Sequence, residues 1–227
     1  MNAYHKIVPL PIAPGQGELP RRTWWRAPET AHGVCMRANA RLRPALARAQ
    51  DQPWPMLAAV CRAASAALLL HPRLNFYTFW GRLRWAGLPP KVCAFLENAD
   101  TSCTGVVIQA AHEMSQGRVI ELLRAGRGQD EAPPSLMARL WPEADYVLRR
   151  LSGVYPAQYV RHNAPLFVSM LWLAGVDDLC YTPAHSMALY PGMPVDGLMP
   201  LTLCYNHQLA NARPVGRLLR TIADLLE

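Results

Sequence analysis

The chain has 227 residues, enough for one domain or a fused pair of small ones, and its formal net charge is +7. Hydrophobic residues make up 51% and charged residues 17%, so the chain can bury a large core and is not a disordered tail. The arginines are scattered, with no run of five basic residues and no interleaved aromatics, which argues against a nucleic-acid groove. A scattered positive surface suits phosphorylated carriers such as coenzyme A or acidic carrier proteins, and a compositional bias toward arginine explains it equally well.

The cysteines and the N-terminal residues indicate the cellular compartment of the protein. The six cysteines form no C-x-x-C pair and no zinc-finger spacing with histidine, and a chain of this length folds without disulfides. We therefore expect reduced thiols and a cytoplasmic protein. The first twenty residues lack an apolar core and are broken by prolines, so we expect no signal peptide. Residues 166–176 form the longest apolar stretch, which is too short to span a membrane.

The N-terminal half predicts an arm followed by alternating strands and helices. Residues 1–32 are interpreted as an arm that prolines and glycines keep from forming a helix. Apolar–polar alternation predicts a strand over 33–42, and an Ala/Leu-rich run predicts a helix over 56–70, entered by Pro53 and Pro55 and ended before Pro72. The aromatic segment 75–85 predicts strands with a turn at Gly81, and two more strands are predicted over 91–98 and 105–110.

The C-terminal half continues this pattern. Helices are predicted over 114–124, 136–151 and 213–226, the last with a clear apolar face. Strands are predicted over 166–172, 186–190 and 199–205. The sequence therefore predicts an α/β (α+β) fold in one domain, residues 33–227, with one or two sheets packed against helices.

A polar turn near the C-terminus holds a candidate base. His207 follows the predicted strand and precedes the last helix, where a side chain can reach a reacting group. The pKa of an unperturbed histidine, about 6.5, suits proton transfer near neutral pH. From these residues alone, an ordinary hydrogen-bonded loop histidine is the simpler interpretation.

The same segment resembles the end of the catalytic domain shared by chloramphenicol acetyltransferase and the acyltransferase component of 2-oxoacid dehydrogenase complexes. In that family a hydrophobic strand is followed by H-x-x-x-D-G and a closing helix; here the six residues are HQLANA, 207–212. Three upstream segments are similar to the family in the same order: LLLHPRLN (68–75), LFVSMLWLAGVDDL (166–179) and YTPAHSMALYPGMPVDG (181–197). The resemblance covers roughly residues 33–227. It implies the chloramphenicol acetyltransferase-like two-layer sandwich, a mixed sheet packed with helices, in a homotrimer.

The resemblance also implies an activity. An acyl group would pass from a coenzyme A or carrier-protein thioester to a thiol, hydroxyl or amine, with His207 as general base and Ser169 as the hydroxyl that donates to the oxyanion. The site would lie between subunits, with His207 of one facing the Ser169 strand of the next. Coenzyme A would be a cosubstrate, no cofactor would be tightly bound, and neither nucleic acid nor a membrane would be a partner. Without lipoyl and peripheral-binding domains, a free-standing biosynthetic enzyme is expected.

Two residues depart from the family motif. Asn211 replaces an aspartate that pairs with an arginine and holds the active-site loop, so Asn211 keeps a hydrogen bond but no charge, with Arg21 or Arg22 as candidate partners. Ala212 replaces a glycine, which indicates that this position is not strictly left-handed. These departures leave two alternatives open: a degenerate member that acts as a scaffold or carrier-binding module, and a thioester hydrolase.

Overall fold

A six-stranded mixed sheet organises the molecule. The computed structural model describes residues 8–9, 33–79, 82–85, 89–97, 103–127, 164–170, 186–207 and 209–227. Within them the sheet has the order β2-β9-β8-β7-β5-β6. Its strands are β2 (Gly33–Arg41), β5 (Lys91–Glu97), β6 (Cys103–Gln109), β7 (Leu166–Ser169), β8 (Met187–Pro191) and β9 (Leu198–Asn206). Strand β7 runs parallel to β5 and β8, and the other pairs are antiparallel. The predicted mixed α/β architecture is confirmed.

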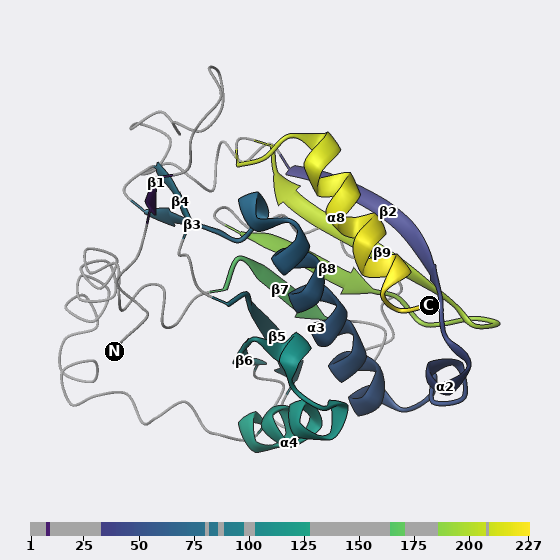
Figure 1. The fold of residues 1–227 in the computed structure, drawn as a ribbon. Helices are drawn as coiled ribbons and strands as arrows, with labels where there is room; N and C mark the ends of the chain where they lie inside the picture. The colour runs from purple at the N-terminus through teal and green to yellow at the C-terminus, as the bar shows by residue number, and fades with distance from the viewer. Residues whose placement is uncertain are drawn as a thin grey trace.

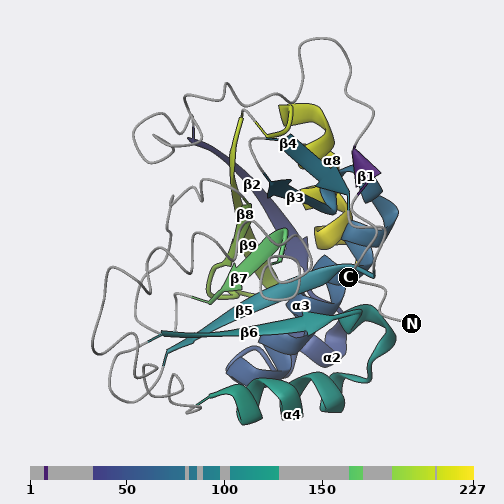
Figure 2. The ribbon, with the colours of Figure 1, turned by 90° about the vertical axis from the view of Figure 1, so that its left-hand side faces the viewer.

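Helices pack on one face of this sheet (Figures 1 and 2). They are α3 (Pro53–Leu70), α4 (Gln116–Gly126) and α8 (Ala212–Asp224), preceded in the chain by the short α2 (Pro44–Ala47). The buried apolar residues of α3 and α8 join those of the sheet in one core. This arrangement gives the two layers of a sheet-and-helix sandwich.

Helix α3 lies at the centre of the helical layer. Its prolines occupy the first turn, where a missing N–H costs no hydrogen bond. It ends at Leu70, with His71 as the C-cap residue, because Pro72 follows. Its length and composition would allow it to cross a membrane, yet 61% of it is buried inside the molecule, and it packs against α4, α8, β5 and β7. Burial in the protein core therefore accounts for its apolar character.

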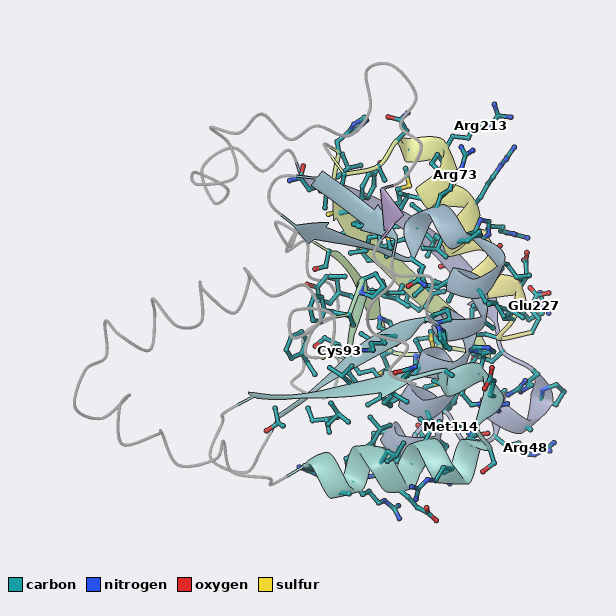
Figure 3. The ribbon with its side chains drawn as sticks, turned by 60° about the vertical axis from the view of Figure 1, so that its left-hand side comes forward. Arg48, Arg73, Cys93, Met114, Arg213 and Glu227 are labelled. Atoms are coloured by element: carbon teal, nitrogen blue, oxygen red, sulfur yellow. The ribbon has the colours of Figure 1, made fainter. Side chains whose placement is uncertain are left out.

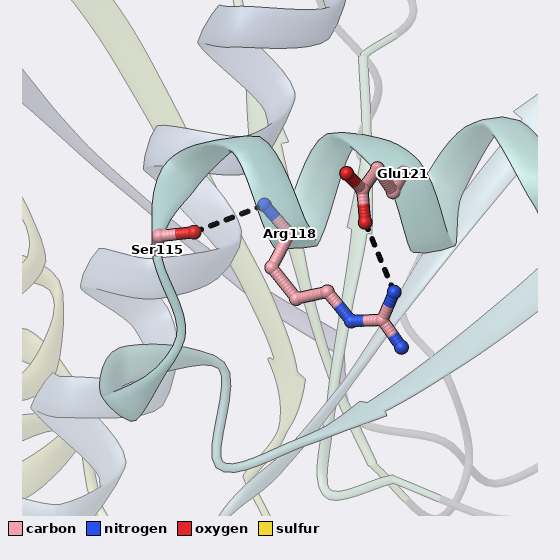
Figure 4. Close-up of polar contacts among 3 residues, drawn as sticks. All are labelled: Ser115, Arg118 and Glu121. Atoms are coloured by element: carbon pink, nitrogen blue, oxygen red, sulfur yellow. Dashed lines mark hydrogen bonds and ion pairs between the residues drawn. The ribbon is translucent and has the colours of Figure 1, made fainter.

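Local contacts fix the start of α4 and the packing of α8. In α4 the Ser115 side chain accepts a hydrogen bond from the backbone N–H of Arg118, and Arg118 pairs with Glu121 at 2.9 Å (Figure 4). The cap satisfies a donor that the first turn leaves free. The apolar face of α8 buries four large side chains, Val215, Leu218, Leu219 and Ile222. The predicted amphipathic helix is thus confirmed.

A smaller sheet has the order β1-β4-β3. It consists of β1 (Val8–Pro9), β3 (Phe76–Phe79) and β4 (Arg82–Trp85). Strands β3 and β4 follow α3 through the 3-10 turn η2 (Pro72–Leu74). Strands β3 and β4 are antiparallel and flank the turn predicted at Gly81. The arm is extended where it is described, since Val8 pairs with Trp85. The helix predicted over 136–151, the rest of the arm and residues 171–172 lie outside the described residues.

The two faces of the large sheet differ in what they carry. Along β9, Leu201, Leu203 and Tyr205 join the core under the helices, so Thr202, Cys204 and Asn206 point to the opposite face, which we call the far face. The far face carries a separate small cluster in which Cys35 packs against Ala188, Tyr190 and Cys204. In Figure 3 the charged side chains of Arg48, Arg213 and Glu227 project from the helical side of the molecule, and Cys93 lies in the strand layer. The far face therefore carries buried polar side chains as well as this small apolar cluster.

Candidate functional site

A tight turn holds His207 at one end of the sheet. The backbone N–H of Leu209 donates to the carbonyl oxygen of Asn206 at 2.9 Å. Asn206 and Leu209 are buried, whereas His207 between them is exposed. The turn is therefore anchored at both ends, and the His207 side chain is exposed between them.

An aromatic ring from the core lies next to this imidazole. The ring centroids of Tyr205 and His207 are 6.2 Å apart, with the planes tilted by 30°. Tyr205 is fully buried, and its hydroxyl has no hydrogen-bond partner among the described residues. Burial raises the pKa of Tyr205, so its hydroxyl stays neutral at physiological pH. Tyr205 thus supports the turn without supplying charge to His207.

Ser169 lies on the far face at the end of β7. Leu166 and Val168 of the same strand point into the core, so Phe167 and Ser169 point the other way. Ser169 pairs with Phe95 of β5, whose ring stacks on that of Phe167 at 5.1 Å between centroids. A half-buried hydroxyl beside aromatic rings is in partly dry surroundings, where a hydrogen bond to a developing negative charge is strengthened.

One chain does not bring His207 and Ser169 together. The registers place Ser169 level with Tyr190 and Thr202, whereas His207 follows Asn206, four residues further along β9 and two strands away. At about 3.4 Å per residue and about 4.8 Å per strand, the backbones of Ser169 and Asn206 are about 17 Å apart. The two candidates lie toward opposite ends of the same sheet, so a site that uses both must combine two chains.

Buried polar groups on the far face were not singled out from the sequence. Lys91, Ser186 and Asn206 are 2%, 6% and 4% exposed, and the registers place them in one row across the sheet at the end where His207 lies. Thr202 and Tyr190 lie in the row of Ser169 and are also buried. The alternation of side chains along β9 is the sequence signal that could have placed Thr202 and Asn206 on the far face. The alignment with Lys91 depends on strand order, which the sequence does not show.

The two departures from the family motif lie at the start of α8. Asn211 is the N-cap residue and is exposed, and its side chain makes no capping hydrogen bond. Ala212 is the first helical residue and has no positive φ, which confirms that this position is not left-handed. Arg21 and Arg22, the candidate partners of Asn211, lie outside the described residues.

A second serine–histidine pair is structural. In α3, Ser65 Oγ lies 2.8 Å from His112 Nδ1, and His112 Nε2 lies 3.6 Å from a carboxylate oxygen of Glu113 in the turn η3 (Ala111–Glu113). These distances resemble a catalytic triad, but Ser65 is fully buried in the helical core and cannot reach a substrate. Among the described residues, no group of three histidines, cysteines or carboxylates is arranged to hold a metal ion.

Comparison with known proteins defines the fold. Protein-family profiles and curated protein sequences give no match to the chain. Among solved structures, a probable dihydrolipoamide acetyltransferase from Listeria monocytogenes matches with a TM-score of 0.59 at 14% identity, over 94% of this chain and 95% of that one. A chloramphenicol acetyltransferase matches with a TM-score of 0.54 at 13% identity, over 91% and 94% of the two chains. The chain therefore has the chloramphenicol acetyltransferase-like fold.

A third structure concerns catalysis directly. The dihydrolipoamide acetyltransferase of Azotobacter vinelandii matches with a TM-score of 0.53 at 17% identity, over 90% of this chain and 85% of that one. It was studied for the role of a serine, a histidine and an asparagine in its catalytic mechanism, the asparagine lying four residues after the histidine. At this identity the likeness establishes the shared fold alone.

Proposed function

We propose that the chain is an acyltransferase that moves an acyl group from a thioester to a thiol, hydroxyl or amine acceptor. The observation that carries the proposal is the fold, which is that of acetyltransferases over nearly the whole chain. The exposed imidazole of His207 in an anchored turn at the end of β9 supports it. Residues 33–227 would form the catalytic domain and residues 1–32 an arm.

The chemistry follows from the two candidate groups. Neutral His207 takes a proton from the acceptor as it attacks the acyl carbonyl. The negative charge that develops on the carbonyl oxygen accepts a hydrogen bond from the Ser169 hydroxyl. When the tetrahedral intermediate collapses, the carbon–sulfur bond breaks, and the leaving thiolate receives the proton from the imidazolium. No covalent acyl-enzyme is formed, so neither Ser169 nor a cysteine acts as nucleophile.

The separation of the two groups supports a site between subunits. Because His207 and Ser169 lie toward opposite ends of one sheet, a head-to-tail contact between copies can bring one end against the other. Such a contact uses different surfaces on its two sides, and it closes into a ring when the rotation between copies allows. We propose a cyclic trimer, in which three identical contacts form three sites.

Asn211 is proposed to support the His207 turn. It stands four residues after His207, the spacing between the histidine and the asparagine studied in the Azotobacter vinelandii enzyme. This match favours a working role for Asn211 over loss of function. Its exposed place at the N-cap of α8 leaves its amide accessible to a partner, for which Arg21 and Arg22 of the arm are the candidates.

The proposed donor is a thioester of coenzyme A or of an acyl carrier protein, used as a cosubstrate and not as a bound cofactor. The formal charge of +7 would attract either phosphorylated or acidic carrier. We propose a cytoplasmic enzyme without nucleic-acid or membrane partners. The acetyltransferases of the same fold support the thioester class, while the acyl group and acceptor are to be found by assay.

The test is acyl transfer by the purified protein. The release of free coenzyme A is followed with a panel of acyl thioesters and with thiol, hydroxyl and amine acceptors, and the size of the assembly is measured in parallel. His207→Ala is expected to lower kcat/KM at least about 10²-fold, and Ser169→Ala about 10²- to 10³-fold. Ser115→Ala, which removes an exposed serine hydroxyl far along the chain from both, is the matched control and should keep wild-type turnover.

Each other outcome contradicts the proposal in a defined way. Release that does not depend on an acceptor identifies a thioester hydrolase. A folded trimer that turns over no thioester identifies a scaffold or carrier-binding module. Full activity in His207→Ala would show that His207 is not the general base.

A further inference from the structure

Two cysteines face each other across the edge of the large sheet. Cys35 of β2 pairs directly with Cys204 of β9, and the two sulfur atoms are 2.8 Å apart. Residues directly opposite in an antiparallel pair have Cα atoms about 4.5–5.5 Å apart. A disulfide forms without backbone movement when this separation is about 4.4–6.8 Å. The strand register therefore already supplies the geometry of a disulfide, and both thiols point toward each other.

The surroundings give the two thiols different access to solvent. Cys204 is fully buried, whereas Cys35 is partly exposed on β2, which pairs with β9 alone in the described sheet. Both pack against Ala188 and Tyr190 on the far face, apart from the main core. A small oxidant can thus reach Cys35 first, with Cys204 held beside it.

Two other thiols, those of Cys61 and Cys93, contrast with the partly exposed Cys35. Cys61 and Cys93 are buried, and burial raises the pKa of each, that of Cys93 to about 12. A thiol that stays protonated is a poor nucleophile, so both are expected to be inert toward small disulfides. Cys93 lies on the far face in the same row as Cys204, which makes it a matched control.

We propose that Cys35 and Cys204 form a dithiol–disulfide couple that fastens the edge strand β2 to β9. The Cys35 thiolate attacks one sulfur of a small-molecule disulfide, forms a mixed disulfide and releases one small thiolate. Cys204 loses its proton and attacks the Cys35 sulfur as a thiolate, the bond to the small molecule breaks, and a second small thiolate leaves and takes up a proton. Two protein thiols are oxidised, and one small-molecule disulfide is reduced to two thiols.

The expected consequence is a more stable sheet edge. The bond would join residues 169 positions apart, and closing so long a loop restricts the unfolded chain strongly. It would also tie down the strand that carries His207, three residues after Cys204. Formation of the bond does not depend on acyl transfer, so this inference and the proposed function can fail separately.

The full-length protein is equilibrated with oxidised or reduced glutathione and then denatured, alkylated and mapped by mass spectrometry. We expect the oxidised protein to lose two alkylatable thiols, to yield one peptide pair linked through Cys35 and Cys204, and to melt at least about 5 °C higher than the reduced protein. Cys93→Ser should behave like the wild type. Cys35→Ser and Cys204→Ser should yield no such linked pair and no rise in Tm.

Three results would overturn the couple. The first is an oxidised protein in which Cys35 and Cys204 are both still alkylated or are linked to other cysteines. The second is glutathione that remains attached to Cys35, which would show that Cys204 does not resolve the mixed disulfide. The third is a rise in Tm that persists in Cys35→Ser. The linkage map on the wild type decides the matter even where a variant fails to fold.

Discussion

The last residue of α4, Gly126, tests how the helical layer is seated on the sheet. A Cβ atom added there would overlap Val106 Cγ2 of β6 and lie 3.3 Å from Val106 Cβ and Cγ1. Valine is stiff at χ1, so its side chain cannot turn away freely. Over-packing a core contact costs about 1–3 kcal/mol, and the better helix propensity of alanine returns up to about 1 kcal/mol. We therefore expect Gly126→Ala to lower the free energy of unfolding by about 1–2 kcal/mol.

Gly117 in the same helix is the matched control. A Cβ atom there would meet nothing within 4 Å, so Gly117→Ala should leave stability unchanged or raise it by up to about 1 kcal/mol. Urea unfolding followed by far-ultraviolet circular dichroism measures the stability of both variants. In a chain that already carries Val106→Ala, adding Gly126→Ala should recover part of the stability that Val106→Ala alone loses. Equal stabilities of Gly117→Ala and Gly126→Ala would refute the packing of α4 on β6.

Two further predictions concern single side chains. His71 Nε2 lies 2.8 Å from Thr221 Oγ1, whose own proton goes to the Arg217 carbonyl, so His71 donates. Burial and the nearby Arg217 lower the pKa of His71 below its usual 6.5, so the unfolded chain binds more protons and stability falls as pH drops below about 6.5. His71→Asn should flatten urea midpoints between pH 7.5 and 5, and an unchanged slope would contradict this. Tyr205→Phe removes a buried hydroxyl that has no hydrogen-bond partner among the described residues, so the free energy of unfolding should stay the same or rise. A fall of more than about 2 kcal/mol in the free energy of unfolding would contradict this and show that the hydroxyl has a partner.

Short sequence patterns predicted most of the described helices and strands, because neighbouring residues determine where such elements form. The Ala/Leu run gave α3, and the structure adds one turn at its start, since prolines fit the first turn of a helix. The apolar face of the last helix predicted α8, alternation predicted β2, and the strand predicted over 199–205 lies within β9. Helix α2 was not predicted because four residues are too few for a helical period to show.

The candidate site could be predicted only in part, because strand order and register are properties of the whole chain. The turn at His207 follows from the sequence next to it. That Ser169 lies toward the other end of the sheet follows only from the pairing of β7 with β8 and of β8 with β9. The same holds for Cys35 and Cys204, which no spacing rule connects.

The arrangement of the site between two chains can be tested by mixing inactive subunits. His207→Ala and Ser169→Ala chains are co-expressed with different tags, trimers carrying both tags are purified, and acyl transfer is compared with each parent. A cyclic trimer that carries both tags has three contacts, of which one joins an intact His207 to an intact Ser169, so the purified trimers should regain about one third of wild-type turnover. A mixture no more active than its better parent would show that no such shared site exists.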